Sequence, residues 1–206
     1  TRAEEAPVTQ GPFRLSWAKN SEPIAGNGRL IVISHGSGGS PWVHANLART
    51  LTQRGFVVAL PQHAGDNHLD PSEPGPPSWK RRPHEVSQAI DRVATNPLLA
   101  PLLSLESVGV FGGSAGGHTA LSLAGGEWSP AGFRDHCLKH IADDFSSCVG
   151  FTTVLRGNWL DTLKLSLAKL IIRWRFDEDT PHRYTDKRVR AVVAMVPFAA
   201  DFSPES

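Results

Sequence analysis

The hydrophobic positions of this chain fall into short apolar runs separated by longer stretches with helical spacing. Apolar runs occupy residues 30–33, 56–60, 108–111 and 191–196. Continuous apolar runs of this length, bounded by turn residues, are typical of strands that are buried on both faces. The sequence therefore predicts four buried strands.

Between these runs, apolar residues recur at the spacing of one helix face. This spacing predicts helices over 42–54, 83–95 and 115–124, whereas the proline-rich stretch 70–77 is predicted to be a loop. Strands that alternate with helices imply parallel strands joined by helical crossovers. We therefore expect an α/β fold, a three-layer α/β/α sandwich with a mostly parallel sheet.

The stretch between the third and fourth predicted strands is far longer than an ordinary crossover. We interpret residues 126–190 as an inserted cap, residues 1–125 as the N-terminal part of the core, and residues 191–206 as a further core strand with its following loop. Within the cap, residues 159–176 predict a helix rich in Leu, Ile, Lys and Arg. This helix either forms a lid over an acyl pocket or meets a lipid surface, or it packs as a plain insertion against the sheet.

Composition narrows the class of protein. The 206 residues are 40% hydrophobic and 20% charged, which fits one globular domain. Lys and Arg number 21 against 20 for Asp and Glu, a balance that argues against nucleic acid as a partner. The longest apolar run, 191–200, is broken by Pro197 and is too short to span a membrane.

The two cysteines, Cys137 and Cys148, lie close together in a chain that begins without Met. Both features are typical of mature exported proteins, so we expect a disulfide and a secreted or periplasmic location. The alternative is a pair of unpaired thiols in a cytosolic enzyme. The cysteine spacing fits no zinc pattern, and the turn that holds His63, Asp66 and His68 has no recognisable ligand pattern, so we expect neither a metal nor a cofactor.

Candidate chemistry begins at the sequence Gly112-Gly-Ser114-Ala-Gly116, directly after an apolar strand and directly before a helical run. This is the setting of a nucleophile elbow, in which a serine occupies a strained strand-to-helix turn. The serine hydroxyl is then exposed at a helix N-terminus, whose dipole favours a developing oxyanion. The alternative is a glycine-rich turn without chemistry.

A second glycine-rich loop, residues 35–39, follows the first predicted strand. Serine hydrolases of this architecture take one oxyanion-hole amide from such a loop and the other from the residue after the nucleophile. Here these would be the backbone amides of Ser37 and Ala115. The alternative is a turn that binds a phosphate or dinucleotide, but the glycine spacing fits neither motif.

At these two motifs the chain resembles the α/β-hydrolase superfamily, over about residues 30–197. Residues 55–58, 63–67 and 83–86 are similar to a bacterial branch known as predicted dienelactone hydrolases, which are related to platelet-activating-factor acetylhydrolases. Dienelactone hydrolases use a cysteine nucleophile, whereas this chain has Ser114. The resemblance therefore implies hydrolysis of ordinary esters rather than lactones.

The resemblance also implies that an acid and then a histidine follow the nucleophile in the chain. The acid is expected after a strand that follows Val196, and the histidine after the last strand. We therefore expect the remaining core strands and both triad partners beyond Ser206, in a remainder that is disordered, removed or present as a separate chain. Without a base, the 206 residues should have almost no activity, because losing it can cost about a million-fold in turnover.

The histidines that follow Ser114 fall in the helix behind the elbow or in the cap: His118, His136, His140 and His182. His118 is expected to pack in its helix, and His35 to fix its own loop. His63 and His68 either line the pocket or lie on a surface loop, and the surface interpretation is favoured. Asp201 follows the fourth strand, where some lipases place the acid, whereas Asp66 is expected to be a structural turn residue.

The sequence thus predicts a serine hydrolase that cleaves small-molecule carboxylic esters through an acyl-enzyme at Ser114. An amidase or peptidase on the same fold is the nearest alternative, because the elbow does not distinguish C–O from C–N cleavage. A non-catalytic module of this fold that binds a ligand or partner is the alternative from a different class.

Overall fold

A computed structural model describes residues 5–206 of the chain and divides them into two compact units. The first unit contains the described residues up to Gly125 together with Tyr184–Phe198. The second contains Gly126–Arg183 together with Ala199–Ser206. The boundaries differ from the predicted cap at 126–190, since the segment before the last strand folds with the sheet and the last eight residues fold with the helices.

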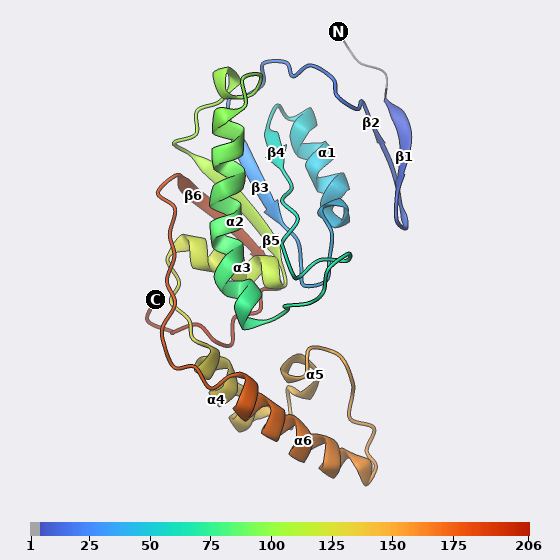
Figure 1. The fold of residues 1–206 in the computed structure, drawn as a ribbon, viewed down its shortest axis with the longest axis vertical. Helices are drawn as coiled ribbons and strands as arrows, with labels where there is room; N and C mark the ends of the chain where they lie inside the picture. The colour runs from blue at the N-terminus through green and yellow to red at the C-terminus, as the bar shows by residue number, and fades with distance from the viewer. Residues whose placement is uncertain (1–4) are drawn as a thin grey trace. The chain divides into compact units, whose positions relative to one another are not determined.

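The first unit is built on a parallel sheet of four strands in the order β4-β3-β5-β6 (Figure 1). The strands are β3 (Leu30–Ser34), β4 (Val57–Ala59), β5 (Val108–Gly113) and β6 (Val189–Met195). All four coincide closely with the predicted apolar runs. The α/β class and the parallel sheet are therefore confirmed.

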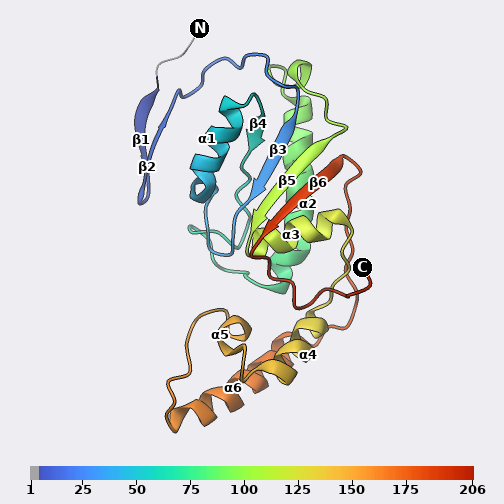
Figure 2. The same cartoon turned by 180° about the vertical axis from the view of Figure 1, so that it is seen from behind.

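Helices cover both faces of this sheet. Helix α2 (Pro76–Thr95) and helix α3 (Ala115–Ala124) pack against each other on one face. Figures 1 and 2 show the two helices beside the sheet from opposite sides. A short 3₁₀ turn, η1 (Pro41–His44), leads into α1 (Ala45–Gln53) on the other face. The core between the sheet, α2 and α3 consists of aliphatic side chains: Leu30, Val32, Val86, Ile90, Val93, Val108, Val110, Ala120 and Leu123.

Helix α2 begins seven residues before the predicted start, at Pro76, so the loop predicted for 70–77 ends early. Pro76 and Pro77 occupy the first turn of the helix, where a backbone N–H has no intrahelical partner and proline costs nothing. Prolines at these two positions are therefore compatible with the start of a helix. A second 3₁₀ turn, η2 (Ala100–Leu102), then leads toward β5.

An antiparallel hairpin precedes the sheet and was not predicted. Its strands are β1 (Ala6–Gln10) and β2 (Phe13–Trp17), with full pairing from Ala6 opposite Trp17 to Gln10 opposite Phe13. The indole of Trp17 stacks on that of Trp42 in η1, with ring centroids 5.0 Å apart. This contact attaches the hairpin to the start of α1.

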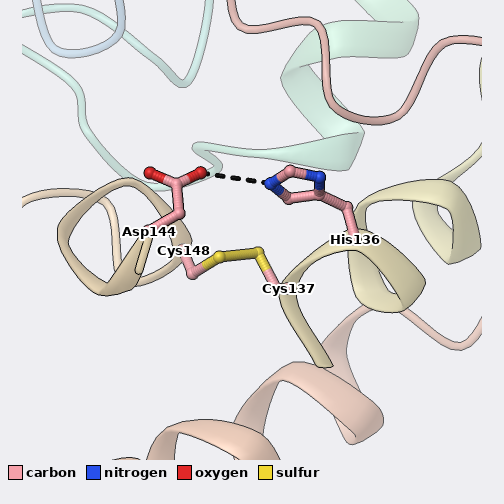
Figure 3. The surroundings of a disulfide bond; sticks show 4 residues. All are labelled: His136, Cys137, Asp144 and Cys148. Atoms are coloured by element: carbon pink, nitrogen blue, oxygen red, sulfur yellow. Dashed lines mark hydrogen bonds and ion pairs between the residues drawn. A yellow bond between two sulfur atoms is a disulfide. The ribbon is translucent and has the colours of Figure 1, made fainter. Parts of the chain in front are cut away.

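The second unit consists of α4 (Pro130–His140), α5 (Phe145–Cys148) and α6 (Leu160–Arg175). Cys137 in α4 and Cys148 in α5 form a disulfide, as predicted, and Figure 3 shows it beside the hydrogen-bonded pair of His136 and Asp144. The rings of Phe133 and Phe176 pack with centroids 4.6 Å apart. The disulfide thus joins α4 to α5, and the packing of Phe133 on Phe176 joins α4 to the end of α6.

The described part of the chain contains no helix that combines the length and the apolar character needed to cross a bilayer.

Replacing Cys137 and Cys148 together by serine should destabilise the second unit by about 3 kcal/mol. The disulfide closes a loop with a sequence separation of 11, and removing it returns that loop's conformational freedom to the unfolded chain. Hydrogen exchange of the amides in α4 and α5, read by mass spectrometry, measures the loss. The intact protein in a thiol reductant is the matched control and should show the same change, while exchange in α2 should stay constant.

Candidate active site

Ser114 lies at the sharp turn between β5, which ends at Gly113, and α3, which begins at Ala115. Its backbone dihedrals are φ 54° and ψ −118°, and its side chain is exposed. Non-glycine residues rarely adopt such a conformation, which costs about 1–3 kcal/mol and persists only where the surroundings enforce it. The structure therefore contains the strained serine turn that the sequence predicts.

Two glycines make this turn possible because they let the backbone of the strand, the helix and the neighbouring strand approach closely. A Cβ atom on Gly112 would overlap the carbonyl oxygen of Gly116, and one on Gly116 would overlap the carbonyl oxygen of Ser34. Any side chain at either position would push α3 away from the sheet. The spacing Gly-x-Ser-x-Gly is thus a steric requirement of the turn.

The loop after β3 passes next to the strained serine. A Cβ atom placed on Gly36 would lie 3.5 Å from the Cβ of Ser114. Ser37 follows and is exposed, while Ala115 is buried as the first residue of α3. Among residues 5–206, neither the Ser37 amide nor the Ala115 amide donates a hydrogen bond to a protein acceptor. Both amides predicted for the oxyanion hole are therefore without a hydrogen-bond acceptor in the described part of the chain.

The peptide group between Gly36 and Ser37 is fixed by its carbonyl. The Gly36 oxygen accepts hydrogen bonds from the His35 ring at 2.7 Å, the Gly39 amide at 3.1 Å and the Arg82 guanidinium at 3.3 Å. The N–H of a trans peptide points opposite to its carbonyl. The Ser37 amide is consequently directed away from this cluster of donors.

Arg82 and Asp66 form a buried ion pair beneath this loop, with 2.9 Å between a guanidinium nitrogen and Oδ2 and no more than 1% side-chain exposure for either residue. The Arg82 guanidinium also donates to the carbonyls of His35 and Gly36. Asp66 in turn accepts from the Ser37 hydroxyl at 2.6 Å and the Gly38 amide at 2.9 Å. The pair therefore fastens both the carbonyls and the donors of the loop.

Burial alone would raise the pKa of Asp66, but the hydrogen bond from Ser37 and the charge of Arg82 outweigh it and hold the pKa below its ordinary value. Asp66 accepts a further hydrogen bond from the Ser78 hydroxyl at 2.8 Å, and Ser78 Oγ also accepts from Arg82 Nε. The carboxylate is thus ionised and fully hydrogen-bonded. This satisfies the condition under which a buried charge pair is tolerated.

Sequence reasoning identified Asp66 as a turn residue and did not identify Arg82. One signal was present. Arg82 stands four residues before Val86, in register with Ile90 and Val93 on the face of α2 that packs in the core. An arginine at a core-facing position indicates a buried anionic partner, because an unpaired charge there would be very costly.

A second buried hydrogen-bonded chain runs from Ser34 through His63 to Glu85. Ser34 Oγ lies 2.7 Å from His63 Nε2, and His63 Nδ1 lies 2.6 Å from Glu85 Oε2. Burial lowers the pKa of His63 despite the hydrogen bond to Glu85. Burial would raise the pKa of Glu85, but the hydrogen bond from His63 outweighs it and the pKa is lowered. A neutral His63 thus donates to an ionised Glu85 and accepts from Ser34.

The hydrogen bonds from Ser34 through His63 to Glu85 have the connectivity of a serine triad, but Ser34 and His63 have no solvent exposure at all. A substrate cannot reach Ser34. The favoured interpretation of His63 and His68 as surface histidines is right for His68, which is exposed, and wrong for His63. His35 fixes its own loop as expected, and its Nε2 also accepts the His63 amide at 3.3 Å.

The other residues considered as triad partners form no hydrogen bond with the Ser114 hydroxyl. Among the described residues, none forms a hydrogen bond with the Ser114 hydroxyl. His118 is buried in α3 beside Trp79, as expected. His136, His140, His182 and Asp201 belong to the second unit. The described residues therefore supply the turn and the amides, and the base is not identified among them.

Three potential metal ligands cluster in the second unit, where atoms of His136, Asp144 and Cys148 lie within 4.8 Å of one another. The Cys148 sulfur is bonded to Cys137, and the His136 ring and Asp144 carboxylate are hydrogen-bonded at 3.1 Å (Figure 3). A sulfur in a disulfide is not the thiolate that binds metal. Cys148 therefore cannot serve as a metal ligand in this cluster while the disulfide is intact.

Replacing Asp66 by Asn should cost about 3–5 kcal/mol in the free energy of unfolding, because it leaves the Arg82 charge buried without its counter-charge. Urea denaturation measures the loss. Arg49→Gln is the matched control, since it breaks an exposed ion pair with Glu5 and should cost less than about 1 kcal/mol. Equal losses in the two variants would contradict the role assigned to the buried pair.

The free energy of unfolding should fall as the pH drops from about 6.5 towards 4. Burial lowers the pKa of His35 to about 4, so between these values the unfolded chain takes up a proton that the folded chain resists. Above pH 6.5 both states are neutral and the histidine has no effect. One such group changes stability by about 1.4 kcal/mol per pH unit. His63 acts in the same direction.

Urea denaturation at several pH values tests this dependence. His35→Asn, which keeps a donor near the Nδ1 position, should show a shallower slope below pH 6.5 than the wild-type protein. His68→Gln, at an exposed position, should keep the full slope. A His35→Asn protein with an unchanged slope would show that His35 titrates normally in the folded state.

No protein-family model matches the chain, and no curated protein matches it in sequence. Among solved structures, the chain is similar to an extracellular α/β-hydrolase from a Paenibacillus species, described as sharing structural and functional homology with tobacco salicylic acid binding protein 2. The two are 16% identical with a TM-score of 0.32. The match covers 75% of this chain and 66% of that protein, so the chain spans about two thirds of the length of this relative.

Proposed function

We propose that this protein is a serine hydrolase of α/β-hydrolase type that cleaves carboxylic esters through an acyl-enzyme at Ser114. One observation carries the proposal: Ser114 is exposed and held at φ 54° between a buried strand and a helix N-terminus. Backbone strain of this kind is concentrated at functional sites. A glycine at this position would relieve it, so a serine there points to use of its hydroxyl.

The oxyanion hole is the second part of the proposal. In it, the amides of Ser37 and Ala115 bind the carbonyl oxygen of the substrate as it gains charge. Both amides lack a protein acceptor among the described residues, and the Gly36–Ser37 peptide is already fixed by three hydrogen bonds to its carbonyl. Preorganised donors of this kind stabilise an acyl-transfer transition state by about 3 kcal/mol each.

The reaction proceeds in two steps. Ser114 Oγ attacks the acyl carbon while a base removes its proton, and the tetrahedral intermediate expels the alcohol as that proton is returned to it. Water then attacks the acyl-enzyme, and the acid leaves with Ser114 restored. The base is to be identified among histidines by substitution, because no described residue is bonded to the Ser114 hydroxyl.

Two further features support an exported ester hydrolase. The disulfide between Cys137 and Cys148 is of the kind that persists in oxidising compartments, which favours a secreted or periplasmic protein. Gly36, the loop residue beside Ser114, has no charged side chain, which suits an uncharged acyl ester. Similarity of residues 63–67 and 83–86 to dienelactone hydrolase-like esterases agrees with this class.

A fluorophosphonate probe should label the full-length protein at Ser114, and Ser114→Ala should abolish both labelling and hydrolysis of p-nitrophenyl esters, by about 10⁴–10⁶-fold in turnover. The measurements are mass-spectrometric mapping of the probe and the rate of nitrophenol release. Ser34→Ala is the matched control. Because Ser34 is inaccessible, this variant should still be labelled at Ser114. Absence of any labelling would favour a non-catalytic binding module, and faster cleavage of matched amides would favour an amidase.

A further inference from the structure

Helix α6 has two apolar faces, and only one of them is buried. Ala168 and Ile172 are buried on the side that lies against α4. Six large apolar side chains of α6 and its first flanking residue are instead 48–81% exposed: Trp159, Leu163, Leu167, Leu170, Ile171 and Trp174. We call these six residues the α6 stripe.

The α6 stripe is continuous along the helix. At about 100° per residue, its six members fall within an arc of about 120°, and Ala168 and Ile172 fall outside that arc on the opposite side. Five members are spaced three or four residues apart, and Ile171 lies next to Leu170, so the side chains form one ridge. Exposed apolar ridges of this length mark an interaction surface rather than scattered surface residues.

Charge selects the partner. Lys169 and Arg173 border one edge of the α6 stripe, and Lys164 and Arg175 border the other, whereas Asp161 is the one acid in the helix. Asp161 is itself engaged by Lys164 and by the amides of residues 156–158. Lys169 and Arg173 form no ion pair with any residue among 5–206. The stripe therefore presents a net positive border to whatever covers it.

We propose that the α6 stripe binds the surface of an anionic lipid bilayer, with the helix lying in the plane of the interface. An amphipathic helix of this kind buries its apolar face about 5–10 Å deep and places its Lys and Arg at the headgroups. Tryptophans at both ends of the stripe match the preference of that residue for the interface. The proposal concerns binding and is independent of the proposed hydrolysis.

A second copy of the chain is a poorer partner for the same surface. Two identical stripes packed together would bring the Lys169 and Arg173 edges of both copies close, with one acid per helix to offset four basic residues. Like charges across an interface oppose association. Anionic headgroups, in contrast, supply a counter-charge along both edges of the stripe.

Co-sedimentation of the full chain, with its disulfide intact, tests the proposal. The protein should bind vesicles of phosphatidylcholine mixed with phosphatidylglycerol and should bind pure phosphatidylcholine vesicles much less. Leu163→Glu with Leu170→Glu should abolish binding to the mixed vesicles. Lys169→Gln and Arg173→Gln should each weaken it by about fivefold, and added salt should weaken it further.

Leu98→Glu is the matched control, because Leu98 is 61% exposed in the first unit and its variant should bind as the wild-type protein does. Lipids with brominated acyl chains should quench tryptophan emission, and Trp159→Phe with Trp174→Phe should remove most of that quenching. Circular dichroism of each variant confirms that it folds.

Three results would overturn the proposal. The first is equal binding to the two kinds of vesicle, and the second is unchanged binding by the Leu163→Glu, Leu170→Glu protein. The third is a concentration-dependent dimer, detected by sedimentation velocity, that this double variant dissociates, which would assign the α6 stripe to a second copy of the chain.

Discussion

The geometry of the candidate site depends on the buried ion pair between Arg82 and Asp66. This pair joins α2 to the loops that follow β3 and β4. Removing two charges from water costs several kcal/mol each, so the arrangement persists only if nearly every donor and acceptor is matched. Asp66 accepts four hydrogen bonds and Arg82 donates to three carbonyls, which leaves one low-energy position for the loop containing Ser37.

Parallel pairing explains why these groups meet. In a parallel sheet the carboxyl ends of all strands lie at one edge. The loops that follow neighbouring strands can therefore meet at that edge. β3 lies between β4 and β5, so the loops after all three strands converge on the same edge. The Ser34 carbonyl leaves no room for a side chain at position 116, and Gly36 lies next to Ser114. Strand order therefore couples the oxyanion loop to the strained serine.

The sequence was most informative where a structure depends on near neighbours. Apolar runs predicted the four strands, and the serine turn was predicted because its glycines lie two residues on either side. The buried network was largely missed because its partners are distant in the chain: 47 residues separate Arg82 from His35, and 22 separate Glu85 from His63. The early start of α2 was missed because proline was counted as a loop residue without regard to its place in the first turn.

The two serines of this site show why hydrogen-bond connectivity alone does not define a catalytic centre. Ser34 has a histidine and a carboxylate in the order of a triad, yet its hydroxyl is sealed and its backbone belongs to a regular strand. The Ser114 hydroxyl forms no hydrogen bond with any described residue, but Ser114 is exposed and strained, and the neighbouring amides of Ser37 and Ala115 have no acceptor among those residues. A single additional side chain is enough to place a base beside a hydroxyl. A strained turn with preorganised amides depends instead on the backbone of several strands and loops at the edge of the sheet. The backbone is therefore the stronger indication of chemistry, and it favours Ser114.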